Sequence, residues 1–168
     1  QDLLSEVDKD SIRFMMLNRS NDVQIDFDFD KVREKTKDNP VFYVQYAYAR
    51  INSLFRTLNT SLVRKIEFDE IDFNLNDMEK KIIRKAFEWP KVIESASKKF
   101  DLHKIPFYLY ELSTLFHAYW SKGNEDKRYK FIENQKIKRK EILAIINLVA
   151  IVIKNGMRIL DVSLPKKM

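Results

Sequence analysis

Residues 39–56 read NPVFYVQYAYARINSLFR and contain a strong helical pattern. Asn39 and Pro40 open it, because a capping side chain followed by proline suits the first turn of a helix. Apolar residues then recur at intervals of three and four and form one helical face: Val44, Ala47, Ile51, Leu54 and Leu58. A second face carries Tyr43, Tyr46 and Arg50. The stretch therefore predicts a helix with an apolar face and an aromatic, basic face.

The rest of the chain also favours helices. Asn76 or Asp77 caps a helix that Trp89-Pro90 ends or kinks, since proline pushes the preceding residue out of helical geometry. Further helices are expected at residues 8–17 and 91–99, from Pro106 to Gly123-Asn124, and at residues 138–160. The last is nearly apolar all round between residues 142 and 153, so we expect it to be the central helix of a bundle. Gly156 either permits close packing within it or marks its end.

Residues 23–29 depart from this pattern. Apolar and polar residues alternate there, which is typical of a strand or an extended segment. No second strand follows nearby, so we expect an extended edge that packs on helices. The chain is accordingly predicted to be all-α, a helical bundle with a short irregular or extended N-terminal segment.

Composition narrows the function. The 168 residues are enough for one domain, and 45% hydrophobic with 33% charged residues indicates a soluble, globular chain. No cysteine is present, which excludes disulfides and thiolate chemistry and fits a reducing cytoplasm. His103 and His117 form no paired metal motif, so no metal site is expected. The net charge of +6 favours a polyanionic partner. The longest apolar stretch, residues 142–153, is shorter than the ~20 residues that cross a bilayer, so no membrane partner is expected.

Four pieces of the chain, in order, resemble one family. Residues 39–51, NPVFYVQYAYARI, are similar to the N-P-V-Y-Y-V-Q-Y-A-H-A-R-I helix that opens the anticodon-binding domain of arginyl-tRNA synthetases. Residues 9–14 (KDSIRF) with 25–30 (IDFDFD) resemble the end of that family's catalytic region. Residues 108–120 (YLYELSTLFHAYW) and 154–168 (KNGMRILDVSLPKKM) resemble its later helix and its ending. The chain departs from the family at Tyr48, where His is usual, at Asp161, where Gly is usual, and at Lys166-Lys167.

The resemblance implies a class I synthetase that activates arginine with ATP and magnesium and transfers it to tRNA. Both nucleotide-binding signatures of the family, H-I-G-H-like and K-M-S-K-S-like, are absent from the 168 residues. We therefore expect this chain to hold no cofactor and to be inactive alone. Residues 1–38 would end the catalytic region, and residues 39–168 would form the anticodon-binding bundle. The implied partners are arginine tRNA and the catalytic domain of the same protein, and a cytoplasmic monomer is expected.

The resemblance also assigns a site. Unpaired bases are read by stacking on aromatic or guanidinium faces and by hydrogen bonds to their edges. In the family, the positions of Tyr43, Tyr46 and Arg50 face the anticodon loop, and those of Trp120 and Met168 lie at the same surface. Asn155 and Arg158 either bind loop phosphates or cap the long helix. Every arginine anticodon has cytosine in the middle, so a pocket for a flipped cytosine is expected.

Other interpretations of the residues remain open. Tyrosines spaced by three residues usually pack in a core. Trp120 is alternatively a helix-end plug, Met168 a frayed tail, and His117 a structural histidine rather than a base. A helical protein-interaction module with no RNA role would use the tyrosine-rich helix as a docking face. A related class I synthetase that reads another tRNA, such as the cysteinyl enzyme, is the closer alternative.

Overall fold

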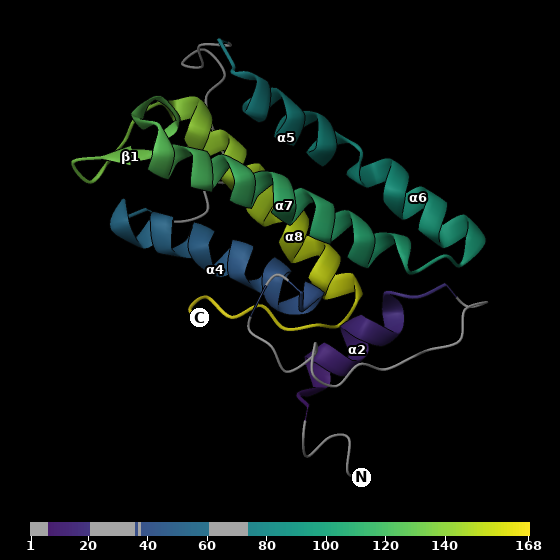
Figure 1. Cartoon of the computed structure of the whole chain (residues 1–168). Helices are drawn as coiled ribbons and strands as arrows, with labels where there is room; N and C mark the ends of the chain where they lie inside the picture. Colours follow the sequence, from purple (N-terminus) through teal and green to yellow (C-terminus); the bar gives the residue numbers. More distant parts are fainter. Residues whose placement is uncertain (1–6, 21–35, 37, 61–73) are drawn as a thin grey trace.

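The computed structural model describes residues 7–20, 36, 38–60 and 74–168 (Figure 1). Its helices are α2 (Lys9–Leu17), α4 (Pro40–Thr57), α5 (Asp77–Phe87), α6 (Trp89–Lys99), α7 (Lys104–Glu125) and α8 (Lys140–Ile159). A 3₁₀ turn, η2 (Lys127–Tyr129), and two short strands, β1 (Ile132–Glu133) and β2 (Lys136–Ile137), lie between α7 and α8. The predicted all-α helical bundle is confirmed. The extended segment predicted at residues 23–29 lies outside the described residues.

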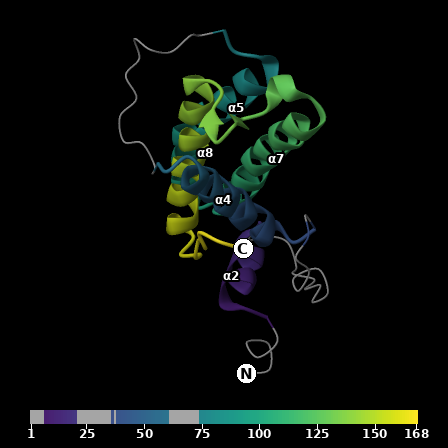
Figure 2. The same cartoon turned by 90° about the vertical axis from the view of Figure 1, so that its left-hand side faces the viewer.

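Helices α7 and α8 pack against each other at the centre of the bundle. Helix α4 contacts both of them on one side, and α5 contacts both on the other (Figures 1 and 2). Helix α6 continues from α5 along α7, and α2 packs against α4. Helix α8 thus touches α4, α5 and α7, as expected for the central helix.

The buried face of α8 explains its composition. Ile146, Val149 and Ile153 on this face are fully buried. A Cβ atom added at Gly156 would lie 2.7 Å from Cδ2 of Leu109 on α7, so the glycine permits the two central helices to approach closely. The close-packing alternative for Gly156 is therefore confirmed.

Helix α8 also has the length and hydropathy of a membrane-spanning helix, the single one of this kind within the described ranges. The sequence expectation counted only residues 142–153, whereas the helix that contains them has 20 residues. Of its apolar window, 56% is buried inside the bundle. Packing against three other helices accounts for this hydropathy without a bilayer.

The helix boundaries follow capping chemistry. The Asn39 side chain accepts a hydrogen bond from the backbone N–H of Phe42 at 3.4 Å, as expected for the cap of α4. Asn76 caps α5 and completes a capping box with Glu79. Helix α5 ends at Phe87 and α6 begins at Trp89, which confirms the predicted break before Pro90. The predicted start of the next helix at residue 91 was two residues late, because Trp89 already belongs to its first turn.

The predicted bounds of α7 were wrong at both ends. The helix begins at Lys104, before Pro106, because proline is accommodated within a first turn. It also continues past Gly123-Asn124 to Glu125, and the N–H of Asp126 still bonds to the carbonyl of Lys122 at 2.8 Å. Gly123 is needed for a close approach, since a Cβ atom there would lie 2.9 Å from the carbonyl oxygen of Tyr129.

A small β-hairpin follows η2 and was not predicted. Ile132 pairs with Ile137 and Glu133 with Lys136 in antiparallel register. Asn134 and Gln135 connect the strands with positive φ angles of 49° and 60°, as a tight hairpin turn requires. Gln135 stands where glycine would have given a stronger sequence signal.

A buried carboxylate ties this hairpin region to the bundle. Glu79 on α5 is fully buried and accepts a 2.5 Å hydrogen bond from the hydroxyl of Tyr119 on α7. It also accepts from the backbone N–H of Asn76 at 2.8 Å and forms an ion pair with Arg139, which precedes α8. Three helices thus share one charged group whose partners balance the cost of its burial.

Replacing Glu79 with Gln will therefore destabilise the fold. The amide keeps the shape but has one acceptor oxygen in place of two, so it cannot accept from Asn76, Tyr119 and Arg139 together, and the lost charge-assisted hydrogen bonds cost about 2 kcal/mol. Urea denaturation measures the loss in the free energy of unfolding. Asp77→Asn is the matched control, because Asp77 loses the same charge from the same helical turn but has a side chain that is 93% exposed. Equal losses in both variants would contradict this role of Glu79.

Candidate nucleic-acid interface

Helix α4 separates an apolar face from a polar, aromatic one. Val44, Ala47 and Ile51 are fully buried against the bundle. Tyr43, Tyr46 and Arg50 are half-buried, so they lie neither deep in the core nor free in solvent. Half-burial leaves part of each side chain accessible to a ligand.

The Arg50 guanidinium lies against two aromatic rings. Its Cζ is 4.4 Å from the ring centroid of Tyr46 and 4.9 Å from that of Trp120 on α7. Its Nη2 also donates a 2.6 Å hydrogen bond to the hydroxyl of Tyr46. Both ring contacts are within the range of cation–π attraction, so they restrain a side chain that would otherwise sample many rotamers.

His117 holds the other side of this guanidinium. Nη1 of Arg50 lies 3.1 Å from Nδ1 of His117, and Nε2 of His117 lies 3.2 Å from the carbonyl oxygen of Tyr43. A guanidinium can only donate and a carbonyl can only accept, so Nδ1 is the acceptor and Nε2 carries the proton. Burial lowers the pKa of His117 to about 4, with the positive charge of Arg50 acting in the same direction. The imidazole is therefore neutral near pH 7.

The C-terminal tail runs along α4. The side-chain amide of Gln45 donates to the carbonyl of Ser163 at 3.0 Å, and Nη1 of Arg56 donates to the carbonyl of Lys166 at 2.9 Å. These bonds lead the last residues in the same direction as the helix, and the C-terminus lies beside α4 (Figure 1). Met168 is thereby brought to the aromatic face.

Helix α2 fixes the start of this tail. Arg13 forms an ion pair with Asp161 and donates to its carbonyl at 3.2 Å, while Asp10 accepts from the N–H of Ser163 at 3.1 Å. Asp161 has a φ of 52°, in the left-handed region that favours glycine. This explains the glycine of the motif that the C-terminal residues resemble, and aspartate is one of the residues that tolerate this conformation.

Helices α4 and α7 and the tail together enclose a pocket of about 460 Å³. The residues that line it are Tyr46, Ala49, Arg50, Ser53, Arg56, Trp120, Lys167 and Met168. It combines two aromatic rings, one restrained guanidinium and the further cations of Arg56 and Lys167. Such a pocket suits a flat, polar ring attached to an anionic backbone.

The structure brings most of the predicted site residues together. Tyr46, Arg50, Trp120 and Met168 line the pocket. Tyr43 does not line it, but its ring lies tilted against that of His117, with centroids 4.4 Å apart. Two further predicted residues, Asn155 and Arg158, do not line it either. Both are exposed on the last turns of α8.

Sequence reasoning missed other lining residues. Ala49, Ser53 and Arg56 follow Tyr46 at helical spacing, so the periodicity of α4 could have identified them. Lys167 depends on the path of the tail, for which the sequence carried no signal. His117 was expected to be structural. Its hydrogen bond to Arg50 orients a side chain that lines the pocket.

The neutral state of His117 makes stability depend on pH. The pKa is 6.5 for an ordinary histidine and about 4 in the fold, so the unfolded chain binds more protons between these values. The contribution is complete above pH 6.5 and is lost as the pH falls towards 4. Between pH 7 and pH 5 the free energy of unfolding should fall by about 2 kcal/mol more than in His117→Gln. Urea denaturation at both pH values measures this difference. An equal change in the free energy of unfolding between pH 7 and pH 5 in the unchanged chain and in His117→Gln would contradict it.

Comparisons with known proteins agree with this geometry. A family model described as the DALR anticodon binding domain matches residues 44–168. Proteins named arginine–tRNA ligase from Pelagibacter ubique and from Chelativorans sp. are 49% identical over 168 residues and 40% identical over 177 residues. Each alignment covers 100% of this chain but only 29% or 30% of the relative. The chain thus spans less than a third of the length of these curated relatives.

Solved structures share the fold. A Campylobacter jejuni protein described as an arginyl-tRNA synthetase has a TM-score of 0.85 at 26% identity, over 99% of this chain and 35% of that one. Arginyl-tRNA synthetase from Plasmodium falciparum has a TM-score of 0.76 at 21% identity, over 99% of this chain and 28% of that one, and shows the fold alone. The matched region of the family model includes all the residues of α4, α7 and the tail that line the pocket. The chain therefore belongs to the family of DALR anticodon-binding domains, in the form that arginyl-tRNA synthetases share.

Proposed function

We propose that the chain binds the anticodon loop of arginine tRNA as part of an arginine–tRNA ligase. The observation that carries this proposal is the Arg50 guanidinium, held between the rings of Tyr46 and Trp120 at the wall of the pocket. A flipped base that enters the pocket meets aromatic surface and fixed N–H donors at once. The relatives are named arginine–tRNA ligases, and these names are the reason for proposing arginine tRNA rather than another tRNA.

The chemistry of the guanidinium favours cytosine in this pocket. One N–H of Arg50 is used by the hydroxyl of Tyr46 and one by His117, and the other N–H groups can reach a base edge. Cytosine presents two adjacent acceptors, O2 and N3, whereas uracil carries a proton at N3 that would oppose these donors. The middle base of every arginine anticodon is cytosine, so this pocket would read the one position that all arginine tRNAs share.

A charge-conserving variant tests the role of Arg50. Arg50→Lys keeps the positive charge but loses the planar fork of donors and the two ring contacts. Affinity for a short RNA hairpin with an arginine anticodon should fall about tenfold or more, and the preference for central cytosine over uracil should disappear. Fluorescence anisotropy of labelled hairpins measures both quantities.

Arg84→Lys is the matched control, because Arg84 is exposed on α5 away from the pocket and keeps its charge. Its affinities should equal those of the unchanged chain. Equal binding of cytosine and uracil hairpins by the unchanged chain would refute specific reading. Unchanged affinity in Arg50→Lys would favour the protein-interaction alternative for this face.

Beyond the pocket, the proposal covers the rest of the parent protein. Residues 1–38 are proposed to end a catalytic region that binds ATP with magnesium, and residues 39–168 to form the anticodon-binding unit. This chain alone is proposed not to aminoacylate tRNA, since it lacks the nucleotide-binding signatures. Asn155 and Arg158 are proposed to contact backbone phosphates outside the base pocket, since both are exposed.

The tail should matter for affinity more than for stability. Arg13 pairs with Asp161 at a largely exposed position, so Arg13→Gln should lower the free energy of unfolding by about 0–1 kcal/mol. The freed tail would hold Met168 at the pocket less often, and RNA affinity should fall about fivefold because pre-organisation is lost. Lys9→Gln removes the same charge from an exposed position of the same helix and serves as the control. Equal losses of RNA affinity in Arg13→Gln and Lys9→Gln would show that the lower net charge, and not the freed tail, causes the loss.

A further inference from the structure

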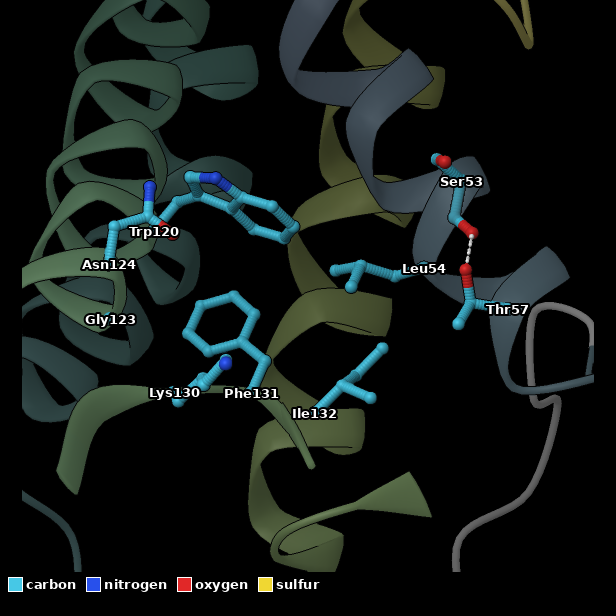
Figure 3. A pocket seen from close by; sticks show the side chains of 9 residues that line it. All are labelled: Ser53, Leu54, Thr57, Trp120, Gly123, Asn124, Lys130, Phe131 and Ile132. Carbon is cyan, nitrogen blue, oxygen red and sulfur yellow. Dashed lines mark hydrogen bonds between the residues drawn. The ribbon is translucent and has the colours of Figure 1, made fainter. Parts of the chain in front are cut away.

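A second pocket adjoins the first one and shares two of its lining residues, Ser53 and Trp120 (Figure 3). We propose that it binds the base next to the middle base of the anticodon, and that the indole of Trp120 separates the two bases. This inference rests on the proposed function, because it takes the first pocket to hold the middle base. Of the residues that line this pocket, only Trp120 was assigned to a binding site from the sequence.

Three separate parts of the chain supply the apolar walls. Leu54 comes from α4, Trp120 from α7, and Phe131 and Ile132 from the start of the hairpin, and their side chains point into a common space (Figure 3). The rings of Trp120 and Phe131 meet nearly edge to face, with centroids 5.6 Å apart. The enclosed volume is about 310 Å³, at the lower end of the range for ligand pockets.

The pocket is already formed without a ligand. Phe131 is buried, and its ring packs on Tyr119 and Phe116 with centroids 4.6 and 6.2 Å apart. Gly123, also in the lining, leaves room for the backbone of residues 129–130 beside α7, since a Cβ atom there would lie 2.9 Å from the carbonyl oxygen of Tyr129. A preformed apolar space loses little side-chain freedom on binding, which favours affinity.

Polar groups gather at the rim rather than in the depth. The exposed side chains of Asn124 and Lys130 lie at the edge, and the hydroxyl of Thr57 donates to the carbonyl of Ser53 at 3.1 Å. The Lys130 amine suits the phosphate that joins two nucleotides. The walls themselves offer carbon faces and edges, which accept any base because every base has a flat π surface.

A shared wall points to a ligand with two flat groups on one anionic backbone. A single-stranded RNA with splayed bases has this form, whereas a small heterocycle would fill only one pocket. Among arginine codons the first base is C or A and the third varies, so both neighbours of the middle anticodon base vary. A pocket that stacks without reading edges fits such a position, beside a pocket that reads a constant one.

Abasic RNA hairpins and a pocket-filling variant test the proposal on the 168-residue chain. Removing the neighbouring base on the 5′ or on the 3′ side should weaken binding about tenfold in one of the two hairpins, which identifies the bound neighbour. Thr57→Trp places an indole in the second pocket from the exposed end of α4 and should weaken the intact hairpin by a similar factor. Thr57→Trp should bind the weaker of the two abasic hairpins with the same affinity as the unchanged chain does, because that RNA has no base to place in the pocket.

Asn124→Trp fills the same pocket from α7 and should reproduce the result if Thr57→Trp folds poorly. Ser97→Trp is the control for an added indole, since Ser97 is an exposed residue of α6 whose hydroxyl bonds to its own helix at 3.0 Å. In both pocket variants the preference for central cytosine should remain. The inference is overturned if neither abasic hairpin loses affinity, or if the pocket variants weaken intact and abasic hairpins equally. Equal binding of hairpins with central cytosine and central uracil by the unchanged chain would instead refute the proposed function. The comparison of intact with abasic hairpins would still test the second pocket.

Discussion

The candidate site depends on one hydrogen bond between two basic side chains. Arg50 donates to Nδ1 of His117, and this bond exists only while the imidazole is neutral. Burial supplies that condition by lowering the pKa of His117 to about 4, and the carbonyl of Tyr43 fixes the tautomer from the other side. An imidazolium at the same place would repel the guanidinium. The orientation of the Arg50 guanidinium is therefore set by an uncharged neighbour in the core.

The same guanidinium is held by parts of the chain that lie far apart in the sequence. Tyr46 is on its own helix, whereas Trp120 and His117 come from α7, and the tail closes the pocket with Met168. The tail is tied in turn to α2 through Asp10 and Arg13. Helix α2 belongs to the segment that resembles the end of a catalytic region. The hydrogen bonds thus form a continuous physical connection between that segment and the pocket.

What the sequence could and could not predict follows from the range of each interaction. Helical spacing in residues 39–56 placed Val44 on the apolar face and Tyr46 on a separate face, because both positions depend on a local period. That the face with Tyr46 is accessible came from the resemblance, since tyrosines at this spacing usually pack in a core. Capping chemistry likewise placed Asn39, and the steric effect of Pro90 on the preceding residue predicted the break there. The contact of His117 with Arg50 joins residues 67 positions apart, and no local pattern encodes it. The resemblance to a family named Met168, but only the structure gives the bonds from Gln45 and Arg56 that bring it to the pocket.

The wrong end of α7 and the missed hairpin have a second cause. Both depend on tertiary contacts at a glycine or at residues with positive φ angles. Gly123 was taken as a helix end, yet it lies inside α7, where glycine is needed because a Cβ atom would lie 2.9 Å from the carbonyl oxygen of Tyr129 in the following segment. That close approach carries Phe131 into the core, and Phe131 in turn builds the second pocket. Arg139, just after the hairpin, is anchored by the buried Glu79 on the opposite side of the bundle from α4. The walls of the pockets are therefore fixed by charges and close contacts outside the pockets themselves, which is why both pockets are formed without a ligand.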